Sequence, residues 1–498
     1  MSSDMPNPQV GYEIFVVSFC DSDQNGIGDL RGIISQLSYL KELGIDCIWL
    51  TPVNPSPSYH KYDVTDYYNI DPAIGTIDDY KALIKEAHAL GIQVLMDLVI
   101  NHTSDQHLWF KEALKYPEND FHEFYIWMHP EEIEARGIAF REGSHDTAQT
   151  EPWHSVDGQQ KKYYGAFWKG MPDLNFKSEK LKNEIRKIIN FWLIEIGVDG
   201  FRMDAARHIF PHWEKDKNPG FWEEFKTWIA ETGKPCLTIG EVWAKTEETA
   251  PYLKGLDSLF NFDLYFFIQQ ILTDEKDPDL VSNLNSIYNQ YSGYNTKFTD
   301  AIFLSNHDQD RISSSCGNNR EKLKLAASIL LTLPGLPIIY YGEELGMLGQ
   351  KPDPFIREPF LWSDNPHDTR ITKVIDPCYS TPETVRVLSQ QQNSEDSVFM
   401  HYKRLIALRK SEPSMASITN YNMQSREMND PELLAFIRPH EVRPLLVIHN
   451  LSKNNKTIHD IQGTGKVLFC NSLFPSTSFN EIILSAYSSI IVIFDNTI

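Results

Sequence analysis

Eight short apolar runs, separated by segments of helical periodicity, occupy most of the first four hundred residues. They span residues 12–19, 47–52, 92–100, 199–205, 236–243, 256–262, 301–308 and 337–344. Most are nearly continuous in apolar residues, as expected for strands that are buried on both faces. Strand–helix alternation repeated eight times predicts an α/β chain folded as a (β/α)8 TIM barrel. A doubly wound open sheet is the alternative, and the count of eight favours the barrel.

The clearest helix is predicted between Ser178 and Gly197. Ser178 is a suitable N-cap, and Gly197 stands where a helix of this length would end. One stripe carries the apolar side chains of Leu181, Ile185, Ile188, Ile189, Trp192 and Ile196. This period predicts an amphipathic helix packed against the barrel.

Two departures from the strand–helix pattern suggest further domains. Residues 103–172 follow the third strand, are rich in aromatic residues and lack helical period, so they predict an inserted domain. After a helix ending near Arg409, short strand-like runs separated by polar turns predict an antiparallel β-sandwich over residues 412–498. The barrel itself is then made of residues 1–102 and 173–411.

Composition excludes several classes of partner. The 498 residues carry a formal charge of −22 and 41% hydrophobic residues, which argues against nucleic acid or an anionic membrane as partner. No apolar run approaches the ~20 residues of a membrane span, and the first residues do not resemble a secretory signal. Cys47 and Cys236 begin strand-like runs and are expected to be buried thiols. We therefore expect a cytoplasmic protein. The alternative is a secreted protein whose signal has been removed. We favour a monomer.

Polar side chains end four of the predicted strands. Asn101 and His102 follow the third, Arg202 and Asp204 end the fourth, Glu241 ends the fifth, and His307 and Asp308 end the seventh. The carboxyl ends of barrel strands share one face, which is where the active sites of such barrels lie. Arg202 and Asp204 are two apart in a strand, so their side chains point the same way. The sequence therefore predicts one active site built from these residues.

Three carboxylates beside an arginine point to glycoside hydrolysis by two acids of opposite protonation. Arg202 would keep Asp204 ionised as a nucleophile, and desolvation could keep Glu241 protonated as a general acid. A zinc hydrolase is the chemical alternative, since His102 and His307 could bind metal. HxH and HExxH spacings are absent, however, which disfavours it.

A separate motif, DSDQNGIGD at residues 21–29, places Asp21, Asp23, Asn25 and Asp29 around glycines. Oxygen-bearing side chains at alternate positions suit a hard cation. The twelfth position counted from Asp21 is Gly32 rather than the glutamate of an EF-hand, so we expect a structural metal loop of another kind.

Four motifs together resemble the signature regions of the α-amylase family of glycoside hydrolases. They are DLVINH (97–102), GFRMDAARH (200–208), GEVW (240–243) and FLSNHD (303–308), and MPDLN (171–175) resembles a fifth. The resemblance covers the whole chain and implies that Asp204 is the nucleophile, Glu241 the general acid and base, and Asp308 the third carboxylate. His102, Arg202 and His307 are similar to contacts at the reactive sugar ring, and Tyr62 resembles the tyrosine that stacks beneath it.

The resemblance also implies metal ligands. The 21–29 loop is similar to a Ca²⁺ loop (or Mg²⁺) formed by Asp21, Asp23, Asn25, the carbonyl of Ile27, and Asp29. A second Ca²⁺ site would use Asn101, Asp173 and the carbonyl of His208.

Specificity within the family rests on SPSYHKYDVTDY (56–67) and on MPDLN (171–175). Tyr59 and His60 resemble the α-amylase pair rather than the acidic residue of oligo-1,6-glucosidases, while Lys61 replaces the usual glycine. We therefore expect endo-hydrolysis of α-1,4-glucans such as starch, glycogen or maltodextrins. Cyclomaltodextrinase- or neopullulanase-like hydrolysis, or an exo-acting α-glucosidase with transglycosylation, are the close alternatives. A non-catalytic transporter partner is disfavoured because all three carboxylates are present.

Overall fold

The structure is a computed structural model that describes residues 7–116, 118–145, 147–416, 418, 421–440, 443–459, 465–473 and 481–494. Contacts divide the chain into two compact units. The first is built mainly from residues 49–260, and the second mainly from residues 6–28 and 261–498.

Eight short strands close into a parallel barrel in the spatial order β1-β11-β10-β9-β8-β7-β3-β2. They are β1 Gly11–Ile14, β2 Cys47–Leu50, β3 Gln93–Leu98, β7 Gly200–Met203, β8 Leu237–Gly240, β9 Ser258–Phe260, β10 Thr299–Phe303 and β11 Leu336–Tyr340. Each lies within or overlaps one of the eight predicted runs, so the predicted barrel is confirmed. Almost every strand residue is buried, which explains why these runs are continuously apolar rather than alternating.

One predicted strand was wrong in its second half. Residues 12–19 were expected to form one strand, but β1 ends at Ile14 and Val16–Phe19 form a short helix, α1. Ser18 N donates to Phe15 O at 3.1 Å, and Gly28 N donates to Val17 O at 2.8 Å, so local contacts replace the sheet ladder. The tertiary contacts override the strand preference of Val16 and Val17.

Helices follow most of the barrel strands. The longer ones are α2 Leu30–Leu43, α3 Ile77–Ala89, α6 Glu179–Asn190, α7 Asn218–Glu231, α9 Phe262–Asp274, α10 Leu280–Ser292, α12 Arg320–Thr332 and α14 Val398–Ser411. Besides α1, the four-residue helices are α8 Thr246–Thr249, α11 Ile312–Ser315, α13 Leu388–Gln391 and α15 Pro413–Ala416. The predicted 178–197 helix is confirmed: Ser178 Oγ accepts from Leu181 N, and a wider turn over Phe191–Ile196 ends at Gly197 with φ +99°.

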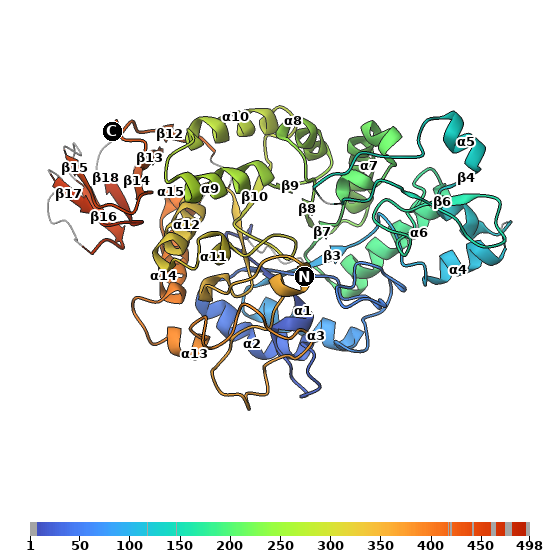
Figure 1. Cartoon of the computed structure of the whole chain (residues 1–498), viewed down its shortest axis with the longest axis horizontal. Helices are drawn as coiled ribbons and strands as arrows, with labels where there is room; N and C mark the ends of the chain where they lie inside the picture. Colours follow the sequence, from blue (N-terminus) through green and yellow to red (C-terminus); the bar gives the residue numbers. More distant parts are fainter. Residues whose placement is uncertain are drawn as a thin grey trace. The chain divides into compact units, whose positions relative to one another are not determined.

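The segment between β3 and β7 forms a small antiparallel sheet (Figure 1) and has its own apolar cluster. The sheet order is β4 (Trp127–Met128), β6 (Lys162–Tyr164), β5 (Trp153–His154). The segment was expected to lack helices, yet α4 (Leu108–Lys115) and α5 (Pro130–Ala135) are present. Its cluster includes Met128, Ile133, Ile138, Trp153, Tyr164 and Ala166. The expected insertion after the third strand is therefore observed, while its limits at residues 103 and 172 remain a prediction.

The C-terminal part is an antiparallel β domain, drawn in red in Figure 1. One sheet has the order β12-β13-β14-β18-β16, formed by Gln424–Ser425, Leu433–Arg438, Leu445–Asn450, Ser489–Phe494 and Gly465–Cys470. The other pairs β15 (Lys456–His459) with β17 (Glu481–Leu484). A shared apolar cluster contains Ile448 and Val492 of the first sheet and Ile458 and Ile482 of the second, as a sandwich requires. Within the predicted 412–498 domain, residues 417, 419–420, 441–442, 460–464, 474–480 and 495–498 lie outside the described residues.

Two further expectations concerned membrane spans and the burial of two cysteines. Within the described ranges, no helix has the length and apolar character of a membrane span. Cys47 is buried as predicted, whereas Cys236 is partly exposed at the start of β8.

Candidate active site

Arg202 is the centre of the polar cluster in the first unit. It lies on β7 with its side chain 1% exposed. Its Nη1 donates to Asp97 Oδ1 at 3.0 Å and to Asp204 Oδ1 at 2.7 Å, and its Nη2 lies 2.8 Å from Glu241 Oε2. Burial opposes the charge of Arg202, but Asp97, Glu241, Tyr62 and Asp204 together raise its pKa well above the usual value. One guanidinium therefore holds three carboxylates.

This arrangement extends the sequence expectation. Arg202 and Asp204 touch, as their spacing in a strand predicts. Arg202 was expected to stabilise Asp204, and it also contacts Glu241. An arginine beside a carboxylate favours the ionised form of that carboxylate. Because Arg202 contacts both Asp204 and Glu241, its position does not by itself distinguish the nucleophile from the general acid.

Asp97 is a member of the cluster that the sequence reasoning missed. The β3–β7 register pairs Asp97 with Arg202, which places their side chains together. Asp97 Oδ2 also accepts from Trp49 Nε1 and from Tyr62 Oη, each at 3.1 Å. The available signal was an acidic residue inside an otherwise apolar strand, and such a residue needs a partner.

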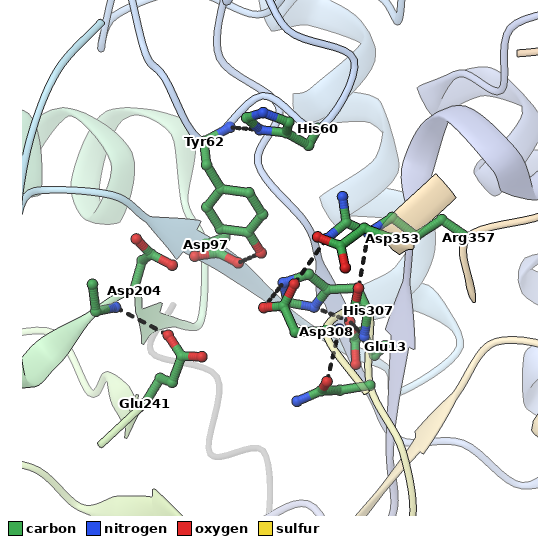
Figure 2. Close-up of polar contacts among 12 residues, drawn as sticks. Glu13, His60, Tyr62, Asp97, Asp204, Glu241, His307, Asp308, Asp353 and Arg357 are labelled. Atoms are coloured by element: carbon green, nitrogen blue, oxygen red, sulfur yellow. Dashed lines mark hydrogen bonds and ion pairs between the residues drawn. The ribbon is translucent and has the colours of Figure 1, made fainter. Parts of the chain in front are cut away.

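Asp204 and Glu241 follow neighbouring strands and share a backbone contact. Ala205 N, next to Asp204, donates to Glu241 Oε2 at 3.1 Å (Figure 2). Ala205 has φ +47° and ψ +39°, a left-handed conformation that is unusual for a residue with a side chain. Such strain is concentrated at functional sites. Asp204 and Glu241 are 7% and 9% exposed, so both are largely shielded from water.

His102 and Tyr62 are joined through the backbone. His102 Nε2 lies 3.1 Å from the carbonyl oxygen of Tyr62, and its Nδ1 lies 3.1 Å from Asn101 Nδ2. The first contact needs a proton on Nε2 and the second a lone pair on Nδ1, which together describe a neutral ring. Burial lowers the pKa of His102, against an opposing effect of Asp204. His60 stacks on Tyr62 with ring centroids 6.1 Å apart.

In the second unit, His307 and Asp308 follow β10. His307 Nε2 lies 3.0 Å from Asp308 Oδ2, and His307 Nδ1 lies 2.6 Å from Glu13 Oε1 (Figure 2). Asp308 keeps 31% of its side chain exposed, whereas His307 is buried. Asp308 is thus oriented by a buried neighbour while remaining accessible.

Arg357 completes this second group and was also missed. Its Nε donates to the carbonyl oxygen of His307 at 2.8 Å, and its Nη2 donates to Asp308 Oδ1 at 2.8 Å and to Asp353 Oδ2 at 3.2 Å. After β11, Asp353 begins a short 3-10 helix (Asp353–Ile356), and Arg357 directly follows it. No strand pattern marks them in the sequence.

The 21–29 loop brings its acidic residues together. Carboxylate oxygens of Asp21, Asp23 and Asp29 all lie within 4.8 Å of one another, a spacing that suits oxygens around one hard cation. Asp21 also accepts from Gly26 N at 2.7 Å, which curls the loop around this point. Asn25 Oδ1 accepts from Ile27 N at 2.7 Å. The donor set fits Ca²⁺ or Mg²⁺.

A second group of oxygens lies beside His102. Asn101 Oδ1 and Asp173 Oδ2 are both buried and have no hydrogen-bond partner among the described residues. Burial raises the pKa of Asp173 well above its usual value, against hydrogen bonding from Ala166 and the charge of Arg141. Unsatisfied buried oxygens are costly, and a cation would satisfy them. These two residues fit the second predicted Ca²⁺ site. The rings of His208 and His102 both contact Phe167.

Lys61 occupies a conformation that explains why glycine is usual there. Its φ is +63°, in the left-handed region that glycine adopts most readily. Its Nζ lies 2.6 Å from Asp71 Oδ2, and both side chains are largely buried. The ammonium group therefore points to an internal partner.

A closed eight-stranded barrel with an arginine and carboxylates gathered at the carboxyl ends of its strands is the arrangement of a glycoside hydrolase. A family model described as the catalytic domain of alpha amylase matches residues 13–417, and one described as the alpha-amylase SusG C-terminal domain matches residues 433–491. The chain belongs to the α-amylase family and acts on α-glucans.

Curated relatives match along nearly the whole length. "Alpha-amylase 3" of Dictyoglomus thermophilum is 38% identical over 484 residues, covering 97% of this chain and 92% of the relative. A 4-alpha-glucanotransferase of Thermotoga neapolitana is 33% identical over 458 residues, covering 91% and 98%. The crystal structure of an alpha-amylase from H. orenii superposes with a TM-score of 0.89 at 38% identity, covering 98% of this chain and all of that one.

Proposed function

We propose that the protein is a retaining endo-hydrolase of α-1,4-glucosidic bonds in starch, glycogen or maltodextrins. The observation that carries the retaining mechanism is the Arg202 guanidinium, whose two terminal nitrogens contact Asp204 and Glu241, while the choice of endo-hydrolysis rests on the Tyr59–His60 pair. Arg202 fixes two buried carboxylates close to each other, as a double-displacement mechanism needs.

Asp204 attacks the anomeric carbon and forms a covalent glycosyl-enzyme. Arg202 stabilises the carboxylate form that this attack requires. Glu241 gives its proton to the leaving oxygen and then takes a proton from the water that releases the sugar. Because Arg202 also favours ionised Glu241, the proton on Glu241 depends on burial and on the bound glucan excluding water.

Asp308 acts as the third carboxylate, binding sugar hydroxyls as positive charge develops at the anomeric carbon. Its partial exposure leaves an oxygen available to a ligand, while Arg357 and His307 fix its orientation. Tyr62 and His102 contact the same sugar ring, with Tyr62 held by Asp97.

The proposed metal is structural. Asp21, Asp23 and Asp29, with Asn25 and the carbonyl of Ile27, would hold Ca²⁺ (or Mg²⁺). Bound there, the ion offsets three negative charges and holds the loop after β1. A second Ca²⁺ would satisfy Asn101 and Asp173 together with the carbonyl of His208.

Product analysis tests the substrate choice. Amylose, maltotriose, cyclodextrin and isomaltose are each incubated with the enzyme, and products are followed from the earliest times. We expect amylose to be cut first into mixed maltodextrins, which is internal cleavage. Glucose as the first product from amylose would indicate an exo-acting enzyme. Faster cleavage of cyclodextrin than amylose would indicate a cyclomaltodextrinase, and products longer than the maltotriose supplied would indicate transfer.

A further inference from the structure

Glu13 is a buried carboxylate near the C-terminal end of β1, and its side chain has a single hydrogen-bonding partner among the described residues. Its Oε1 accepts from His307 Nδ1 at 2.6 Å and from His307 N at 3.3 Å. Its Oε2 is buried and has no hydrogen-bond partner among the described residues. Glu13 is 0% exposed, so water does not solvate its carboxyl group. A buried carboxylate in this position is tolerated when a positive charge lies beside it.

His307 offers that charge. Its Nδ1 faces Glu13 and its Nε2 faces Asp308 Oδ2 at 3.0 Å, so both ring nitrogens lie against carboxylate oxygens. Carboxylates accept hydrogen bonds, and only the imidazolium form donates from both nitrogens. Burial lowers the pKa of His307, but Asp308 and Glu13 outweigh it and raise the pKa to about 10.

The other charged groups around this pair act in both directions. Arg357 donates to the carbonyl of His307 and to Asp308, and its positive charge opposes a second positive charge nearby. Tyr340, which pairs with Glu13 in the β1–β11 register, donates its hydroxyl to the carbonyl of Ile356 and lies beneath the guanidinium of Arg311. Burial raises the pKa of Tyr340 far above its usual value, so its hydroxyl stays neutral. Without Glu13, the positive charges of His307 and Arg357 would have to be balanced by Asp308.

We propose that Glu13 is a positioning residue that holds His307 as a fixed imidazolium, with its Nε2–H directed at Asp308. The proposal rests on the proposed role of Asp308 in binding the substrate. Asp308 accepts from both His307 and Arg357, so its two oxygens are held by separate donors. Loss of the Glu13 charge weakens the hold of His307 and frees Asp308 to turn.

The test is Glu13→Gln, which keeps the shape and an acceptor oxygen but removes the charge. Ring-¹⁵N-labelled histidine in the full chain reports the protonation of His307, assigned by comparison with His307→Gln. In the wild type we expect an imidazolium signal that does not change from pH 5 to 9. In Glu13→Gln we expect the ring to titrate near neutral pH, a shift of at least two pH units. A neutral His307 in the wild type at pH 7 overturns the proposal, even if the variant does not fold.

Glu344→Gln is the matched control. Glu344 is also fully buried in the second unit, and accepts from Tyr12 and Tyr39 rather than from a histidine. This variant should leave the His307 signal unchanged. A His307 titration that moves equally in both variants would indicate a general loss of packing and overturn the proposal.

Kinetics connect the contact to the reaction. The ratio of kcat/KM in Glu13→Gln to that in the wild type should be constant at acidic pH and fall tenfold per pH unit above the new His307 titration. This ratio cancels the ionisation of Glu241, which is common to both proteins. A ratio that is independent of pH overturns the positioning role. Hydrolysis retained in Asp308→Asn would refute the proposed role of Asp308 in the reaction. It would not bear on the Glu13–His307 contact, which the NMR titration measures without substrate.

Discussion

Glu343 is a buried acid whose protonation should govern the pH dependence of stability. It lies after β11, 2% exposed, and accepts from Ser305 Oγ at 2.8 Å and from Tyr402 Oη at 2.9 Å. Burial raises its pKa from 4.5 to about 8, with the two hydrogen bonds opposing that rise and Glu344 adding to it. In the folded protein Glu343 is therefore neutral over most of the physiological range.

The direction in which Glu343 changes stability with pH follows from the protons it binds in the folded and unfolded states. Between pH 4.5 and about 8 the unfolded chain loses the Glu343 proton while the folded chain keeps it. The folded state binds more protons in this window, so this group's contribution to stability falls as pH rises. At about 1.4 kcal/mol per pH unit, the loss over the window amounts to roughly 3–5 kcal/mol.

Glu343→Gln removes the titration and keeps an uncharged group of the same shape. The melting temperature of the wild type, measured by calorimetry from pH 5 to 8, should fall more steeply than that of the variant. At pH 8 the variant should be the more stable of the two. Glu231→Gln, at an exposed position ending α7, should follow the wild type. Parallel curves for wild type and Glu343→Gln would show that Glu343 is not neutral in the folded state.

Three further outcomes test the site and the loop. Asp204→Asn and Glu241→Gln should each lower hydrolysis by more than about a hundredfold with the circular dichroism spectrum unchanged; activity within tenfold of wild type contradicts the roles assigned. Proton NMR of the earliest products should show the α-anomer, since retention follows from a covalent intermediate on Asp204; an initial β-anomer means inversion. EDTA should lower the melting temperature, because a cation bound only to the folded state stabilises it, and Asp23→Ala should remove most of that sensitivity; a melting curve that EDTA leaves unchanged contradicts the metal loop.

The sequence alone predicted the barrel, because a strand buried on both faces must be apolar at every position and eight such runs alternate with helices. It also predicted local contacts whose geometry is set by short spacing. Arg202 touches Asp204 because residues two apart in a strand point the same way, and Ser178 caps its helix because the free backbone N–H groups lie within reach.

The tertiary structure alone decided which distant residues complete the site. Asp97 meets Arg202 through the β3–β7 register, Glu13 meets His307 across 294 positions, and Arg357 reaches Asp308 from an irregular segment. A strand that is apolar on both faces has no alternation to show which side chains point into the barrel, and register depends on the neighbouring strand. The end of β1 at Ile14 was also decided by the tertiary structure. The contacts of the folded chain, rather than the strand preference of Val16 and Val17, set the end of the strand.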